Sequence, residues 1–225
     1  MTDYESPLKA EDVRQICLMN GLEIHDKQWF LLERWSILLL DLNKKVNLIS
    51  RKETEFLWEK QILSCLALLI LRKFNLDAEI CDFGTGGGLP GMPLAIVRPD
   101  LKLTLFESRQ KKVLAVKKMI EILKIPNVQI VLGRGEELAK KRQWCKRFSY
   151  VTSRAVASPT DIVSWTKDLR KEKSVLHIFK GGKIKEEINV LSKKFSGLKI
   201  SSSSIKLIGF TKFAENNKFL ISIEF

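Results

Sequence analysis

Hydrophobic residues recur at two different spacings along this chain of 225 residues, and the spacing changes near residue 78. Up to that point apolar side chains recur every three or four positions, which is the period of an amphipathic helix. The pattern predicts helices over residues 8–19, from Asp26 as N-cap to about residue 42, and over 53–74. The aromatic side chains in these stripes are typical of a packed core.

Beyond residue 78, short apolar runs alternate with amphipathic segments, which predicts strands alternating with helices. Such alternation indicates an α/β fold, a doubly wound and mostly parallel sheet whose ligand lies beyond the carboxyl ends of the strands. No helix is predicted between the last two strands, so we expect an antiparallel last strand. The expected strands are 78–82, 101–106, 127–132, 149–153, 174–179, 204–210 and 218–225, and the expected helices are 90–97, 109–124, 136–143, 159–169 and 184–195.

The chain therefore divides into two predicted parts. Residues 1–77 form a helical N-terminal extension packed on the core, and residues 78–225 form the α/β domain.

A glycine-rich turn follows the first predicted strand, with the sequence Asp82-Phe83-Gly84-Thr85-Gly86-Gly87-Gly88-Leu89-Pro90-Gly91. Its spacing fits both the GxGxxG dinucleotide pattern and a denser GxGxG pattern. Glycines allow a tight turn and let main-chain N–H groups approach a ligand. Either pattern is weak by itself, because a plain glycine-rich turn also matches it.

Two acidic residues make the turn more informative. Asp82 directly precedes the first glycine, and Glu107 ends the next predicted strand, near the spacing at which an acid binds ribose hydroxyls. Acids on both sides suit S-adenosylmethionine, which carries an ammonium, a sulfonium and a ribose diol. They suit a pyrophosphate poorly. The pattern thus favours S-adenosylmethionine over a dinucleotide.

Charge is distributed unevenly along the chain, whose formal net charge is +13. Residues 1–78 carry 11 basic and 12 acidic side chains, whereas residues 79–225 carry 28 and 14. The segment 109–147 alone has a net charge of +9. A basic surface beside the glycine turn favours a polyanionic partner such as nucleic acid, although a solvated lysine surface gives the same counts.

Composition narrows the class of protein further. Hydrophobic residues make up 45% of the chain, and the four cysteines lie far apart, as is usual for reduced thiols. The most apolar run, residues 62–71, is too short to cross a bilayer. Only two histidines are present, so no zinc site is expected, and His177 falls in an apolar strand where a structural role is expected. We therefore expect a cytoplasmic, monomeric protein without a membrane partner.

Several segments together resemble one bacterial family. They are Asn47-Leu48-Ile49-Ser50, the glycine turn with Pro93-Leu94-Ala95-Ile96, Glu107-Ser108 with Lys111-Lys112-Val113, Arg134-Gly135-Glu136-Glu137, Ser153-Arg154-Ala155 and Lys180-Gly181. With these, the chain resembles the ribosomal-RNA guanine-N7 methyltransferases once called glucose-inhibited division protein B. The Gly-Leu-Pro-Gly segment followed by Ser-Arg-Ala is quite specific to that family.

The resemblance implies a Rossmann-like class I methyltransferase fold, S-adenosylmethionine as cofactor, and 16S ribosomal RNA or the small ribosomal subunit as partner. It implies that the turn wraps the methionine part, that Glu107 holds the ribose, and that Arg154 lies near the target base as the catalytic residue. The full set of expected donor-binding residues is Asp82, Gly84, Thr85, Gly86, Gly88, Leu89, Glu107, Ser108, Gly135, Glu136 and Arg154. The expected RNA-binding residues are Asn47, Arg51, Arg109, Lys111, Lys112 and Lys180.

The third predicted helix departs from the family pattern. A His-x-x-Asp-Ser arrangement is usual there, and Gln61, Ser64 and Cys65 occupy those positions. Alanine is common in the family where this chain has Gly135. The segments expected to bind the methyl donor are intact, so we expect activity to be kept.

The chemistry of guanine N7 fits the residues that are present. N7 carries an in-plane lone pair and no proton, so it can attack a sulfonium methyl directly, and catalysis then depends on placement and electrostatics. The chain has no Pro-Cys dipeptide for cytosine-C5 methylation and no Asn- or Asp-Pro-Pro-aromatic motif for an exocyclic amine. Arg154 can hydrogen-bond guanine O6, pair with a phosphate, or salt-bridge a neighbouring loop.

Two other functions stay open at this point. An NAD(P)-dependent oxidoreductase would use the same glycine pattern, although Asp82 would repel its pyrophosphate. A non-enzymatic RNA-binding or ribosome-assembly protein would explain the charge but not the acids around the turn. The sequence names neither the nucleotide modified nor the form of the RNA substrate.

Overall fold

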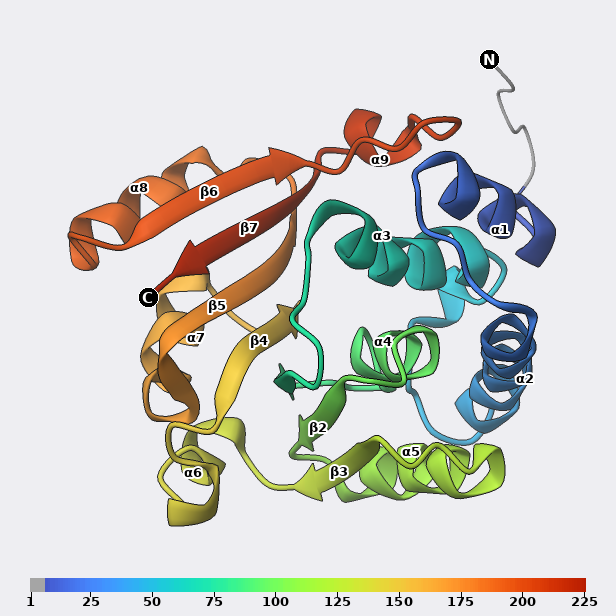
Figure 1. Cartoon of the computed structure of the whole chain (residues 1–225), viewed down its shortest axis with the longest axis horizontal. Coiled ribbons are helices and arrows are strands. Elements are labelled where there is room, and N and C mark those ends of the chain that lie inside the picture. The colour runs from blue at the N-terminus through green and yellow to red at the C-terminus, as the bar shows by residue number, and fades with distance from the viewer. Residues whose placement is uncertain (1–6) are drawn as a thin grey trace.

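A seven-stranded sheet runs through the computed structural model, which describes residues 7–225 (Figure 1). The strand order is β3-β2-β1-β4-β5-β7-β6; the first five strands run parallel, and β7 is antiparallel to both its neighbours. The order reverses between β1 and β4, which creates a topological switch point at their carboxyl ends. The strands are β1 (Glu79–Phe83), β2 (Lys102–Glu107), β3 (Val128–Leu132), β4 (Phe148–Arg154), β5 (Arg170–Gly181), β6 (Lys199–Ser204) and β7 (Lys218–Glu224).

Helices cover both faces of the sheet, and each face has its own hydrophobic cluster (Figure 1). On one face lie α4 (Gly91–Val97) and α5 (Gln110–Leu123). On the other lie α6 (Gly135–Leu138), α7 (Pro159–Trp165) and α8 (Lys185–Lys194), with single 3₁₀ turns at Arg142–Trp144 and Lys167–Leu169. The fold is thus the doubly wound sheet with an antiparallel last strand that the sequence predicts.

The N-terminal helices share the cluster of the first face. They are α1 (Ala10–Met19), α2 (Asp26–Asn43), a 3₁₀ turn (Arg51–Glu53), a π-helix (Leu57–Leu63) and α3 (Ser64–Leu71). Helix α2 packs on α4 and α5, and Trp29 and Trp35 are buried in the same cluster as Leu103 and Leu105 of the sheet. The division at residue 77 stays a prediction, and the first six residues of that part lie outside the described residues.

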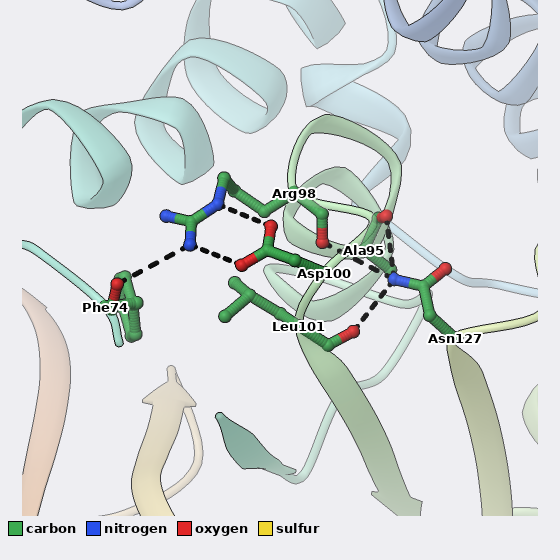
Figure 2. A network of polar contacts seen from close by, with 6 residues as sticks. All are labelled: Phe74, Ala95, Arg98, Asp100, Leu101 and Asn127. Carbon is green, nitrogen blue, oxygen red and sulfur yellow. Dashed lines mark hydrogen bonds and ion pairs between the residues drawn. The ribbon is translucent and has the colours of Figure 1, made fainter. Parts of the chain in front are cut away.

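A polar network fastens the connection from α4 to β2 (Figure 2). Arg98 donates to both carboxylate oxygens of Asp100, and Asn127 Nδ2 donates to the carbonyls of Ala95 and Leu101 at 3.0 and 2.9 Å. Arg98 Nη2 also reaches the carbonyl of Phe74 at 3.5 Å. The network fixes the amino ends of β2 and β3, away from the carboxyl ends where a ligand is expected.

Two expectations about the local structure of the N-terminal part are wrong. His25, not Asp26, is the N-cap of α2, which begins at Asp26 itself. The single helix predicted over 53–74 is broken into the 3₁₀ turn, the π-helix and α3.

The strand expected at 204–210 is also misplaced. Strand β6 is instead Lys199–Ser204, a hydroxyl-rich strand at the exposed sheet edge, where an apolar pattern is not required. The apolar residues Ile205, Leu207 and Phe210 are buried in the cluster of the first face. A short helix, α9 (Lys212–Glu215), separates β6 from β7, so the expectation of no helix between the last two strands is wrong, although the two strands pair antiparallel as expected.

His177 lies buried inside β5, in accord with its expected structural role. Its Nδ1 atom is 3.0 Å from the Ser222 hydroxyl, and Arg72 donates to the hydroxyls of Ser222 and Ser203 at 2.9 Å each. Burial, with a smaller contribution from Arg72, lowers the pKa of His177 to about 3. The ring is therefore neutral in the folded protein at neutral pH.

The titration of His177 predicts an acid-dependent loss of stability. Because its folded-state pKa is lower than the ordinary 6.5, its contribution is complete above pH 6.5 and is lost as the pH falls toward 3, at about 1.4 kcal/mol per pH unit at most. We expect denaturant unfolding between about pH 7 and pH 4.5 to show a shallower fall in the free energy of unfolding for His177→Asn than for the wild type. Parallel pH profiles for the two proteins would contradict this role.

Candidate active site

A cavity of about 920 Å³ opens at the carboxyl ends of the parallel strands, at the switch point between β1 and β4. Its walls come from the glycine turn after β1, the ends of β2, β4 and β5, the π-helix, and the segment around α9. A cavity of this size is large enough for a nucleoside-sized ligand and part of a second one. Elements far apart in the sequence therefore meet at one site.

The glycine turn is held from below by Asp82. Its Oδ2 atom accepts hydrogen bonds from Thr85 Oγ1 at 2.6 Å and from the Gly91 N–H at 2.9 Å, while Oδ1 accepts from Thr152 Oγ1 at 3.0 Å. The side chain is fully buried, and burial raises its pKa to about 6 despite these bonds. Asp82 thus does not line the cavity, where the sequence places it, but ties the turn to α4 and β4.

Glu107 fixes the turn from the side. Its Oε2 atom accepts from the Gly86 N–H at 3.0 Å, and Oε1 accepts from the Arg109 N–H at 2.8 Å. Glu107 and Ser108 both line the cavity. Since a carboxylate oxygen can accept more than one hydrogen bond, Glu107 keeps acceptor capacity for a ligand hydroxyl.

The structure brings most of the expected donor-binding residues together, but not all. The residues that line the cavity are Gly84, Thr85, Gly86, Leu89, Glu107, Ser108 and Arg154. Gly88, Gly135 and Glu136 do not line it. A Cβ at Gly135 would come 2.3 Å from the Phe83 ring, and Glu136 pairs with Arg134 at 3.1 Å.

The expected RNA-binding residues divide in the same way. Arg109, Lys112 and Lys180 line the cavity, whereas Asn47, Arg51 and Lys111 lie outside it. Lys180 is paired with Glu187 of α8 at 2.9 Å. The segment after Asn47 reaches the cavity through Leu48, which packs against Gly87.

Arg154 connects the end of β4 to the π-helix. Its Nη2 donates to the carbonyl of Lys60 at 3.1 Å and its Nη1 to that of Gln61 at 3.4 Å, with Cys65 Sγ at 3.5 Å. A π-helix is wider than an α-helix and is common at functional sites. Burial raises the pKa of Cys65 to about 11, so this thiol is protonated and is not a nucleophile at neutral pH.

Sequence reasoning missed one side of the cavity. It is formed by Glu53, Glu59, Lys60, Gln61, Ser64, Lys212, Phe213, Asn216 and Lys218. Gln61 donates to Glu53 Oε2 at 2.8 Å, and Ser64 donates to the Gln61 carbonyl at 3.0 Å. The departures from the family pattern at Gln61 and Ser64 marked this segment, but α9 gave no signal because it lies in the linker predicted between the last two strands.

The sheet order, the glycine turn after β1 and the acid that ends β2 define the class: the chain has the fold of a Rossmann-like methyltransferase. Solved structures agree at the level of the fold. A SAM dependent methyltransferase from Aquifex aeolicus has a TM-score of 0.55 and 13% identity over 83% of this chain and 97% of its own. The fibrillarin/Nop5p complex gives a TM-score of 0.56 and 14% identity over 72% and 81%.

The chain belongs to the family of rRNA small subunit methyltransferase G, whose family model matches residues 28–214. Proteins named Ribosomal RNA small subunit methyltransferase G are 36% identical in Chlorobium limicola, over 77% of each chain, and 33% identical in Clostridium novyi, over 82% of this chain and 76% of that one. The family expected from the sequence is confirmed. Membership favours a methyltransferase over an oxidoreductase or a non-enzymatic RNA-binding protein.

Within residues 7–225, no helix is long and apolar enough to span a membrane. In the same part of the chain, no three His, Cys, Asp or Glu side chains are grouped as metal ligands.

The hydrogen bonds of Arg154 predict that it stabilises the π-helix. Arg154→Ala removes two donors to main-chain carbonyls, and we expect amide hydrogen exchange over residues 57–66 to become about tenfold faster or more. Arg154→Lys should restore little, because an ammonium cannot reproduce the planar fork. The matched control is Arg134→Ala, since Arg134 is an exposed arginine of the β3–α6 turn. Unchanged exchange in Arg154→Ala would contradict the role.

Proposed function

We propose that this protein transfers a methyl group from S-adenosylmethionine to N7 of a guanine in small-subunit (16S) ribosomal RNA. The observation that carries the proposal is the joining of the glycine turn to Glu107 at the wall of a cavity that Arg109, Lys112 and Arg154 also line. The glycine turn and Glu107 suit a cationic methyl donor with ribose hydroxyls. The basic side chains suit a polyanion.

The residues of the turn fit the donor. Gly86 has a φ of +60°, and a Cβ there would meet only Lys112 Nζ, at 3.8 Å, so the glycine leaves open space on the cavity side. Glu107 and Ser108 would hold the ribose. The family resemblance implies an adenine position near Gly135 and Glu136, which lie outside the cavity lining.

Bound S-adenosylmethionine would supply an electrophilic methyl group on its sulfonium. The protein would then position guanine N7 in line with that group, without removing a proton, because N7 has none. The ionisable groups near the turn are consistent with a reaction that removes no proton. Asp82 is buried beneath the turn, and the thiol of Cys65 is protonated. Arg154 would orient the base through O6 or its phosphate while it braces the π-helix.

The RNA would be held mainly through its phosphates. Arg109, Lys112 and Lys180 lie at the cavity, and Asn47, Arg51 and Lys111 would extend the contact beyond it. Residues 79–225 carry an excess of 14 positive charges, from 28 basic and 14 acidic side chains, which favours binding to a polyanion. We place this reaction in the cytoplasm and assign it to a monomer.

Donor binding is tested by Gly86→Val. A β-branched side chain disfavours positive φ and would project into the donor space, so calorimetry with S-adenosylmethionine should show no binding. Gly182→Val is the matched control, because Gly182 also has a positive φ (+82°) with no atom within 4 Å but does not line the cavity. Both variants should lose similar stability, and only the first should lose the donor. Equal affinity in a folded Gly86→Val protein would refute the site.

The reaction is tested by mapping methylated nucleotides in ribosomal RNA. Cells that lack the gene should lose one N7-methylguanine from 16S ribosomal RNA, and the wild-type gene should restore it. A gene carrying Arg154→Ala should restore it only weakly, whereas Gly182→Val should restore it. If the two RNA maps are identical, the proposed reaction is wrong, and full restoration by Arg154→Ala would make Arg154 structural only.

A further inference from the structure

One acidic residue of the cavity has no role in the donor site. Glu59, in the middle of the π-helix, lines the cavity and is only 5% exposed. Among the described residues its Oε2 atom accepts no hydrogen bond, and its ion pair with Lys212 Nζ is long, at 3.9 Å. A buried carboxylate without hydrogen-bond donors is costly, so one left in this state in a ligand cavity points to donors that a ligand brings.

The surroundings of Glu59 restrict what that ligand can be. Its chain neighbours Lys60 and Gln61 are held by Arg154, so the position of the carboxylate is fixed relative to the end of β4. Phe213, next to Lys212, adds aromatic surface to the same cavity. A buried carboxylate in a cavity that an aromatic side chain also lines is suited to a planar base that presents N–H donors.

We propose that Glu59 recognises the target guanine by accepting hydrogen bonds from its N1–H and 2-amino groups. This inference rests on the proposed function. Guanine is the base that presents two adjacent donors on its Watson–Crick edge, whereas adenine presents an acceptor at N1. The carboxylate therefore selects guanine and directs the opposite edge of the ring, which carries N7, away from the π-helix.

The same contact assists the chemical step. As the N7–CH₃ bond forms and the S–CH₃ bond breaks, the electron pair goes to sulfur, and the purine becomes a cation with no proton transferred. Positive charge on the ring makes N1–H a stronger donor, so its bond to Glu59 is stronger in the transition state than in the bound substrate. An interaction that strengthens in this way raises the rate, not only the affinity.

The test compares two variants on two RNAs by single-turnover transfer of labelled methyl groups. Glu59→Gln replaces an acceptor by a group that also carries N–H donors, and it should slow transfer about 10- to 100-fold. Glu55→Gln is the matched control, because Glu55 is an exposed acid of the same segment outside the cavity, and it should transfer at the wild-type rate. Affinity for S-adenosylmethionine should be unchanged in both.

The second RNA carries inosine at the mapped position, introduced by splint ligation. Inosine keeps N7, O6 and N1–H but lacks the 2-amino group, so the wild type should methylate it about tenfold more slowly than guanosine. Glu59→Gln should not distinguish the two RNAs, whereas Glu59→Asp, which keeps the charge, should still distinguish them. This loss of discrimination is not expected from a variant that only disturbs the fold.

The outcomes distinguish a failure of the role proposed for Glu59 from a failure of the proposed methyl transfer. If Glu59→Gln methylates guanosine normally, or discriminates against inosine as strongly as the wild type, Glu59 does not contact the base. If the wild type methylates no guanine at N7, the proposed function fails, and the role of Glu59 fails with it.

Discussion

The geometry of the site depends on one buried carboxylate. Asp82 lies at the end of β1 with no exposed surface, and its three hydrogen-bond donors come from the turn, from α4 and from β4. An ionised carboxylate buried without donors would be very unfavourable, so the chain must keep these three segments around it. A Cβ at Gly91 would come 2.9 Å from Asp82 Oδ2 and 2.1 Å from Leu105, which leaves no room for a side chain there.

This constraint extends from β1 across the cavity. Thr152, one of the donors to Asp82, lies two residues before Arg154 on β4, and Arg154 in turn holds the π-helix by its carbonyls. Glu107 closes the other side through the Gly86 N–H. The turn, the β4 end and the π-helix are therefore linked by hydrogen bonds from one side of the cavity to the other. A substitution at any of these links would move both the glycine turn and the opposite wall of the cavity.

The parts of this arrangement that the sequence predicts are those set by local patterns. The strands β1, β2 and β4 are largely buried because both faces of the sheet are covered, and they end in Asp82-Phe83, Glu107 and Arg154, which fixes the site at one edge. β6 was missed because an exposed edge strand needs no apolar face. The π-helix was missed because its apolar spacing resembles that of an α-helix, and only its main-chain hydrogen bonding distinguishes it.

Two of the expected donor-binding residues are also constrained by packing. Gly135 matches a donor-binding motif, and packing also requires glycine there, because an added Cβ would come 2.3 Å from the Phe83 ring. Asp82 was expected to meet the ligand because it precedes the turn. Along a strand, however, successive side chains point to opposite faces, and the direction of Asp82 is decided by what packs around it.

The distribution of charge in the cavity fits the two unlike ligands of the proposed reaction. The basic side chains Arg109, Lys112 and Lys180 are suited to binding the phosphates of RNA. RNA phosphates are exposed to solvent, and they attract cationic side chains over a distance of about 10 Å at ordinary salt. The acids Glu107 and Glu59 are buried, so they act only on groups that enter the cavity. In the proposed reaction both ligands would bring hydrogen-bond donors there: the ribose hydroxyls of the methyl donor, and the N–H groups of a guanine. The basic side chains attract phosphates at long range, and the buried acids accept hydrogen bonds at short range. The two effects are compatible because they act at different depths in the same cavity.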